Sequence, residues 1–158
     1  MSISRRSLFV LLALLTVGGL GWALWPAPNE ADRVRAVIGG IADGAEAGDV
    51  GAMMAPLGEG FVAESDGYTA DKPTVRAVVM RQFLRRGRVS TLLSKIEVTV
   101  EGVGAHASFD AILAESGAEW TDVIPVDADR WHLEVDLRRS EDEWSVTRVV
   151  RSSAPLLP

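Results

Sequence analysis

The sequence predicts an α+β fold, with a single N-terminal transmembrane helix followed by one domain of about three helices on an antiparallel sheet. Three observations predict it. An uncharged apolar run covers residues 8–25, apolar residues recur at helical spacing from 34 to 83, and beyond residue 90 they alternate with polar residues. Helices that precede long alternating strands are typical of domains whose helices gather on one face of a sheet.

The N-terminal segment has the features of a membrane anchor. Arg5 and Arg6 precede the run Leu8–Trp25, in which no residue is charged. Eighteen residues at helical rise span roughly 27 Å, close to a hydrocarbon core of about 30 Å. Trp22 and Trp25 suit the far interface, where indole rings sit between lipid and water. We therefore expect a single-pass signal anchor.

Two alternatives to a retained anchor stay open. A cleaved signal peptide has a shorter apolar core and small residues before the cut, and Gly21 and Ala23 form only a poor version of that pattern. Residues 4–9 also resemble a twin-arginine export signal, although the positive-inside rule already explains the arginines. The expected location is a bacterial inner membrane, with the domain in the periplasm or cell exterior.

Composition narrows the partners and cofactors of the domain. The chain has no cysteine, which removes disulfides, thiolate metal sites and lipid-modified cysteines. Its formal net charge of −6 disfavours nucleic acid, because phosphate binding needs a basic surface. The part beyond the anchor is long enough for one core, and the sequence indicates no cofactor.

Helical spacing begins directly after the linker 26–29. One apolar stripe comprises Val34, Val37, Ile38, Ile41, Ala42 and Ala45. Gly48 is expected to end this helix, and Asp49 to cap a short second helix that carries Val50, Met53, Met54 and Leu57. A short strand at 61–63 and a turn-rich stretch at 64–71 follow.

A third helix is expected after Asp71, which can cap it, with Pro73 in its first turn. Its expected inner face comprises Val75, Val78, Val79, Gln82 and Phe83. Its polar face and end carry Arg76, Arg81, Arg85, Arg86 and Arg88. Cations near a helix carboxyl end complement the helix dipole, so we favour this structural role over binding of anionic lipid or an acidic partner.

Alternation with period two predicts the strands. Leu92, Ser94, Ile96, Val98 and Val100 form the inner face of one expected strand. The inner positions of the later strands are Ala107, Phe109, Ala111 and Leu113, then Trp131, Leu133, Val135 and Leu137, and finally Trp144, Val146 and Arg148, with Val149 offset. Four aromatic residues are expected to be largely buried: Phe83, Phe109, Trp131 and Trp144.

The order and spacing of these elements resemble the nuclear transport factor 2-like superfamily, which includes ketosteroid isomerases and polyketide cyclases. The resemblance rests on Ala47-Gly48-Asp49 between two helices, on Gly60-Phe61-Val62 before the third helix, and on the closing strands with Trp144. It covers residues 30–153 and leaves 154–158 as a tail. It implies a cone-shaped domain whose curved sheet wraps around the helices and often leaves a pocket.

The resemblance does not decide function, because enzymes and binding modules share this fold. An isomerase needs a carboxylate in an apolar pocket. Tyr68, the only tyrosine, lies in a predicted loop, and Asp110, Glu134 and Asp136 alternate with inner residues, so we expect them on the outer face. The histidines, His106 and His132, have no recognised metal-ligand spacing, and a site with Asp110 is the weaker alternative to surface positions.

The connection 115–129 is the remaining place to look for function, because long loops are often functional. It contains Trp120 and Ile124 among several acids. We expect Tyr68, Trp120 and Ile124 near the open end of the cone, as a surface for a ligand or partner, including a homodimer. The sequence thus favours a membrane-tethered, non-enzymatic domain that binds a protein partner or small apolar ligand. The alternative is an exported isomerase- or cyclase-like enzyme with a pocket carboxylate.

Overall fold

The computed structural model describes residues 29–86, 89–115 and 129–153. No helix within these ranges is long and apolar enough to cross a membrane. The predicted anchor Leu8–Trp25 and the loop residues Trp120 and Ile124 lie outside the described residues, so the predictions made for them stay predictions.

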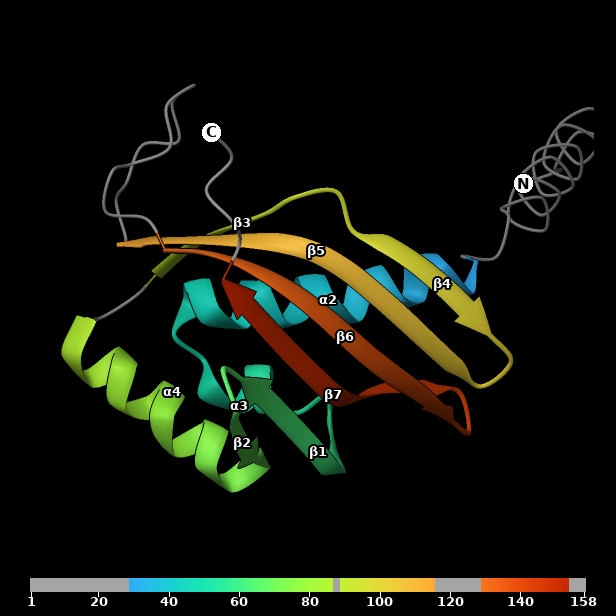
Figure 1. Ribbon diagram of the computed structural model, residues 1–158, viewed down its shortest axis with the longest axis horizontal. Coiled ribbons are helices and arrows are strands. Elements are labelled where there is room, and N and C mark those ends of the chain that lie inside the picture. Colours follow the sequence, from blue (N-terminus) through green and yellow to red (C-terminus); the bar gives the residue numbers. More distant parts are fainter. Residues whose placement is uncertain (1–28, 87–88, 116–128, 154–158) are drawn as a thin grey trace, which may run out of the picture.

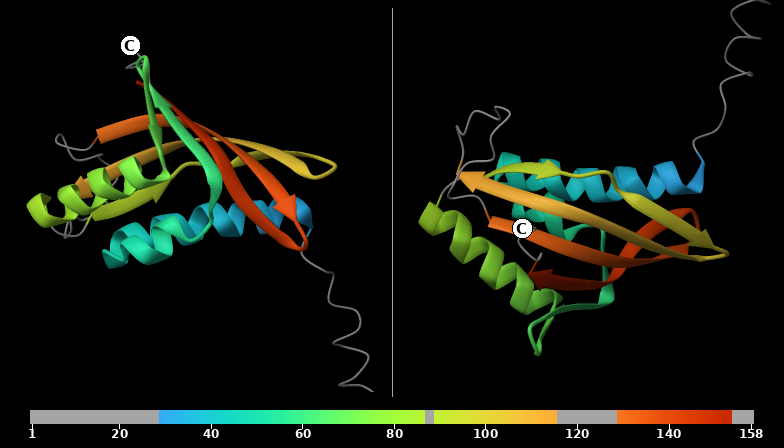
Figure 2. Two further views of the ribbon diagram at one scale, coloured as in Figure 1. Left: turned by 90° about the horizontal axis from the view of Figure 1, so that it is seen from below. Right: turned by 45° about the horizontal axis from the view of Figure 1, so that its top comes forward.

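The domain is α+β, as predicted, and its sheet curves around one long helix (Figures 1 and 2). The helices are α2 (Glu30–Ala47), α3 (Val50–Met54) and α4 (Lys72–Arg86). The strands are β1 (Leu57–Ser65), β2 (Tyr68–Asp71), β3 (Val89–Leu93), β4 (Glu97–Glu101), β5 (Gly104–Glu115), β6 (Asp129–Ser140) and β7 (Glu143–Ser153). The sheet order is β2-β1-β7-β6-β5-β3, with β4 also paired to β5. The pair β1–β7 is parallel and the other pairs are antiparallel.

The caps confirm three predicted helix boundaries: the end of α2 at Gly48 and the starts of α3 and α4 at Asp49 and Asp71. Asn29 accepts a hydrogen bond from the backbone N–H of Asp32 at the start of α2, and Gly48 ends α2 with φ +70°. Asp49 caps α3 through the N–H of Ala52, and Asp71 accepts from the N–H of Thr74 at the start of α4. Glycine suits position 48 because this left-handed conformation strains residues that carry a Cβ.

The core lies between α2 and the concave face of the sheet (Figure 2). Val34, Ile38 and Ala45 are the buried hydrophobic residues of α2, on the predicted stripe. The sheet contributes the buried side chains of Phe61, Ala105, Ala107, Phe109, Ala111, Val135, Leu137, Trp144 and Val146. Phe109 and Trp144 are therefore buried as predicted. Trp131 and Phe83 are only half-buried, which corrects the prediction for these two aromatics.

The single strand predicted from Leu92 to Val100 is wrong, because the chain forms β3 and β4 with a break between them. Leu93 pairs with Ala111 and Glu97 pairs with Ser108, so three residues lie opposite two. One extra residue of this kind moves the following side chains to the other face. Leu92 is consequently 44% exposed and Ser94 is exposed, whereas Ile96, Val98 and Val100 pack against the core as predicted.

The region from Leu57 to Asp71 is more regular than predicted. Leu57 begins β1 instead of ending the second helix, and the stretch expected to be turn-rich is a hairpin. Asp66 and Gly67 form its turn with positive φ angles of 47° and 82°. Two such residues are typical of the tight turns that match the twist of antiparallel strands.

Helix α4 lies across the end of the fold away from the start of α2, and it contacts β1, β2 and α3 (Figure 1). Val75 and Val79 pack against the core, but Val78 is 50% exposed and Gln82 is exposed. The predicted inner face is therefore too wide. The helix buries only a narrow stripe because it contacts the end of the sheet and not its broad concave face.

Glu30 joins the first turn of α2 to the last two strands. Its carboxylate accepts a hydrogen bond of 2.8 Å from Trp144 Nε1 and lies 3.0 Å from Arg139 Nη1. The bond from Trp144, with the charges of Arg139 and Arg33, lowers the pKa of Glu30. An acid in the first turn also complements the helix dipole.

The first test of this core is Phe109→Ala. The substitution should lower the free energy of unfolding by about 3–5 kcal/mol, because it removes a buried aromatic ring and leaves a cavity. Glu97→Ala, on the exposed face of β4, should change it by less than about 0.5 kcal/mol. An unchanged melting temperature for Phe109→Ala would mean that β5 does not face the core as described.

The second test concerns Glu30 and pH. Because the pKa of Glu30 is lower in the folded than in the unfolded chain, its stabilisation is present above the unfolded value and is lost as pH falls through the folded value. Glu30→Gln should therefore lower the melting temperature at neutral pH. In this variant the melting temperature should also fall less steeply than in the wild type as the pH is lowered. A fall as steep as that of the wild type would contradict the assigned contact.

Candidate functional site

A cavity of about 220 Å³ lies between the second half of α2, α3 and the concave face of the sheet. The helices line it with Ile38, Ile41, Ala42, Ala45 and Met53. The sheet lines it with Thr91, Leu93, Phe109, Ala111, Leu113, Trp131, Leu133, Val135, Val146 and Val149. Among the described residues the lining is apolar except for the hydroxyl of Thr91.

Side-chain size explains why the cavity lies at this end of α2. At the other end, the indole of Trp144 fills the space near Glu30. Toward the end of α2, Ala42 and Ala45 line the cavity from the helix, and Ala111 lines it from the sheet. Methyl groups do not span the gap between a helix and a sheet, whose usual separation is near 10 Å. The sequence therefore leaves this end of the interface hollow.

Two buried polar atoms near the cavity have no hydrogen-bond partner in the described part of the chain: Thr91 Oγ1 and Arg151 Nε. The backbone N–H of Thr91 is satisfied, since it donates to Glu46 Oε1 at 2.9 Å. Arg151 lies over the ring of Trp131, with Cζ 4.2 Å from the ring centroid. Buried polar atoms without partners are uncommon, so each calls for an explanation.

The faces of β7 differ from the prediction that placed Trp144, Val146 and Arg148 together. Val146 pairs with Leu137 and Arg148 with Asp136, so Thr147 is an extra residue in β7. The bulge sends Arg148 to the convex face and returns Val149 and Arg151 to the concave face. Arg151 was consequently missed as a site residue, because an unbroken period of two predicts the opposite face for it.

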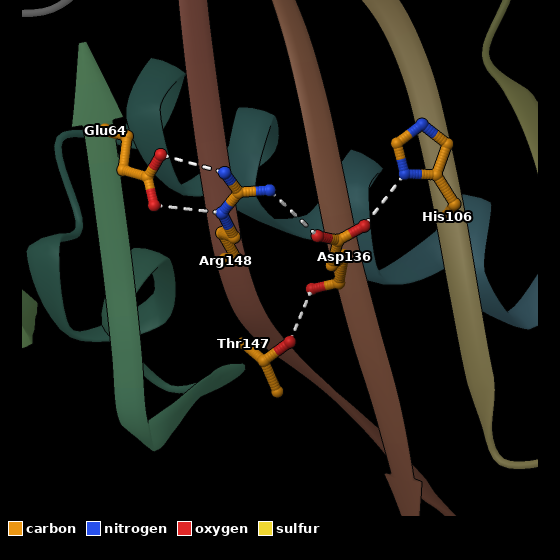
Figure 3. A network of polar contacts seen from close by, with 5 residues as sticks. All are labelled: Glu64, His106, Asp136, Thr147 and Arg148. Carbon is orange, nitrogen blue, oxygen red and sulfur yellow. Dashed lines mark hydrogen bonds and ion pairs between the residues drawn. The ribbon is translucent and has the colours of Figure 1, made fainter. Parts of the chain in front are cut away.

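The convex face carries a polar network (Figure 3). Arg148 donates two hydrogen bonds to Glu64, at 3.0 and 2.8 Å, and lies 3.6 Å from Asp136. Asp136 in turn accepts from His106 Nδ1 at 2.8 Å. The bonds from Arg148 lower the pKa of Glu64, and the carboxylate raises the pKa of Arg148. The network therefore links four strands across the outer surface.

A second polar group on this face comprises Ser108, His132 and Asp110, connected in the order serine, histidine, aspartate that a catalytic triad has. Ser108 Oγ lies 3.3 Å from His132 Nε2, and His132 Nδ1 lies 2.8 Å from Asp110 Oδ1. Arg130 donates to the same carboxylate at 2.6 Å and is the main cause of the lowered pKa of Asp110, followed by His132. A triad also needs free backbone N–H donors for an oxyanion. Ser108 lies in the middle of β5, between β4 and β6, where the backbone is engaged in sheet pairing.

The structure places the other candidate residues away from the cavity. Asp110, Glu134 and Asp136 lie on the convex face, as predicted, and the two histidines form separate pairs with Asp110 and Asp136. Within the described ranges, no group of three histidine, cysteine, aspartate or glutamate side chains could hold a metal ion. Tyr68 is 83% exposed at the β1–β2 hairpin and does not line the cavity. Its role in ligand or partner binding, with that of Trp120 and Ile124, stays a prediction.

Comparison with known proteins identifies the fold. No family model matches the chain, and no curated protein matches its sequence. Among solved structures, a cystatin-like protein of unknown function from Nostoc punctiforme has a TM-score of 0.64 at 11% identity, covering 80% of this chain and 92% of that one.

Two further structures are described as nuclear transport factor 2-like. The protein from Pseudomonas putida has a TM-score of 0.64 at 18% identity, covering 77% of this chain and 84% of that one. The protein from Novosphingobium aromaticivorans has a TM-score of 0.64 at 17% identity, covering 99% and 94%. The resemblance noted in the sequence is thus confirmed at the level of fold, and the chain has the nuclear transport factor 2-like, cystatin-like fold.

Proposed function

We propose that this chain is a membrane-tethered, periplasm-facing, non-enzymatic domain that binds a small apolar ligand in the cavity beside α2. The observation that supports this function is the lining of the cavity, where fourteen of the fifteen residues are apolar. Ligand pockets are mostly apolar hollows with few polar groups, and burial of apolar surface supplies the binding free energy.

The volume of the cavity sets the size of the apolar body that can be buried in it. A dry apolar cavity of about 150 Å³ holds benzene, and pockets for drug-sized molecules begin at about 300 Å³. A cavity of about 220 Å³ lies between these limits. Scaling from benzene, its ligand has an apolar body of roughly nine or ten carbon atoms.

The lining favours binding over isomerase- or cyclase-like catalysis. Proton abstraction beside a carbonyl needs a carboxylate in the pocket and a donor for the oxyanion. The described lining residues include no aspartate, glutamate, histidine or tyrosine. Asp110 and Asp136 are engaged with histidine and arginine on the opposite face of the sheet.

A direct test is photo-labelling of the intact chain, in bilayer discs, with a diazirine derivative of decanol. The wild type should be labelled at cavity residues such as Met53 and Phe109, identified by peptide mass spectrometry. Ala42→Phe should reduce this labelling about tenfold, because the ring occupies the cavity. The matched control is Ala77→Phe, on the exposed face of α4, which should label like the wild type.

The milder variant Ala42→Leu covers the case in which the phenyl ring disturbs folding. Melting curves show which variants remain folded, and the labelling of folded variants decides the test. Equal labelling of cavity peptides in the wild type and a folded, filled variant would contradict the proposed site.

The tether is tested separately. The mature protein should keep Leu8–Trp25 and sediment with the membrane fraction, because the apolar run is long and the cleavage pattern is poor. Amino-terminal sequencing should find no mature start between about residues 24 and 30; such a start would overturn the anchor. Reversal of Arg5 and Arg6 to acids should weaken the cytoplasmic orientation of the amino terminus.

A further inference from the structure

We infer that the ligand of this cavity carries a single carboxylate, and that Arg151 is the residue that binds it. This inference rests on the proposed function and adds the chemical class of the ligand. The ligand class is therefore an apolar monocarboxylate, either a medium-chain fatty acid or an aromatic acid of similar size. Three observations on Arg151 support it: its place in the sheet, the absence of an acid beside it among the described residues, and its stacking on Trp131.

The pairing of β6 with β7 places Arg151 on the concave face. Arg151 is the register partner of Leu133, and Val149 is that of Val135. Leu133, Val135 and Val149 all line the cavity. Directly opposed residues of an antiparallel pair point to the same face of the sheet, with Cβ atoms about 5 Å apart. Arg151 therefore lies on the same face as the lining residue Val149, two residues further along β7.

Three other arginines of the sheet each have an acid beside them, whereas the guanidinium of Arg151 has none within the described ranges. Arg130 pairs with Asp110, Arg139 with Glu30, and Arg148 with Glu64. Arg151 is half-buried, and its Nε is buried without a hydrogen-bond acceptor in the described part. A buried N–H of a cation is costly to leave unpaired, which favours an anion at this position.

Stacking on Trp131 holds the guanidinium in place. Cζ of Arg151 lies 4.2 Å from the centroid of the indole ring, which itself lines the cavity. A guanidinium stacked by its face still presents its N–H groups at its edges, where a carboxylate accepts two parallel hydrogen bonds. The same indole contacts the apolar body of the ligand, so one side chain serves both parts of the molecule.

The charge and size of the site select a monocarboxylate among anionic ligands. One cation balances one negative charge, whereas the described cavity offers no second cation for a phosphate dianion. The rest of the lining requires an apolar body of roughly nine or ten carbon atoms. Decanoate and decanol are thus suitable matched probes, since they share a chain and differ in the head group.

The experiment compares diazirine derivatives of decanoate and decanol as competitive photo-labels of the intact chain in bilayer discs. Each is titrated, and its labelling is corrected for the amount partitioned into the bilayer. The wild type should label with decanoate at about tenfold to hundredfold lower free concentration than with decanol, the gain expected of a charge-assisted hydrogen-bonded pair. Arg151→Met should remove this preference and leave decanol labelling unchanged. Arg151→Lys should keep part of it.

Arg148→Met is the matched control, because it removes the same charge from the opposite face of the same strand. It should keep the wild-type preference for decanoate. Equal labelling by both probes in the wild type, or a preference for decanoate that persists in Arg151→Met, would overturn the role of Arg151. In either case, labelling of cavity residues by the decanol probe would still support the cavity as the binding site. Loss of the preference in Arg148→Met as well would also overturn the role of Arg151, as an effect of net charge. Absence of cavity labelling with either probe would instead refute the proposed function.

Discussion

The packing of α2 against the concave face of the sheet is the contact on which the rest of the structure depends. Val34 and Ile38 bury one side of the helix against strands that come from far along the chain. Glu30 fixes the start of the helix to Trp144 and Arg139, at the turn between β6 and β7. Near Glu30 the interface is filled by Trp144, and toward the other end of α2 it contains the cavity.

Side-chain volume along that interface divides it into a filled part and a part with the cavity that we propose as a ligand site. The large indole of Trp144 is buried near Glu30, whereas the small residues Ala42, Ala45 and Ala111 line the cavity toward the other end of α2. Apolar cavities reduce stability, since the lining atoms lose contacts that a filled core would give them. A ligand that fills the space would restore those contacts, so the proposed binding would also raise the stability of the domain.

Two bulges decide which residues face the cavity and which face solvent. The extra residue between β3 and β4 turns Leu93 inward and Leu92 outward, and the extra residue Thr147 moves Arg148 outward and Arg151 inward. The polar groups on the convex face satisfy one another, as the links from Glu64 to His106 show (Figure 3). Arg151, which has no acid beside it among the described residues, is left on the side where an apolar ligand is proposed to bind.

The sequence predicted much of this architecture and little of the site, for physical reasons. Helix caps such as Asp49 and the alternation along β5 are local signals, and both were predicted correctly. A bulge inserts one extra residue into a strand whose side chains otherwise alternate between the two faces, and no short sequence pattern marks its position. The faces of Leu92, Arg148 and Arg151 therefore could not be predicted. The cavity is lined by both Ala42 and Ala111, which are separated by 68 residues in the sequence, and no local pattern predicts that they come together.

The most direct test of the central claim is the structure of the protein in crystals pressurised with xenon, which occupies dry apolar cavities. The account predicts a xenon atom between Ala42 and Ala111, in contact with the side chains of Phe109 and Leu133. Ordered water in this space, or side chains that close it, would contradict the claim that an apolar ligand site lies beside the end of α2.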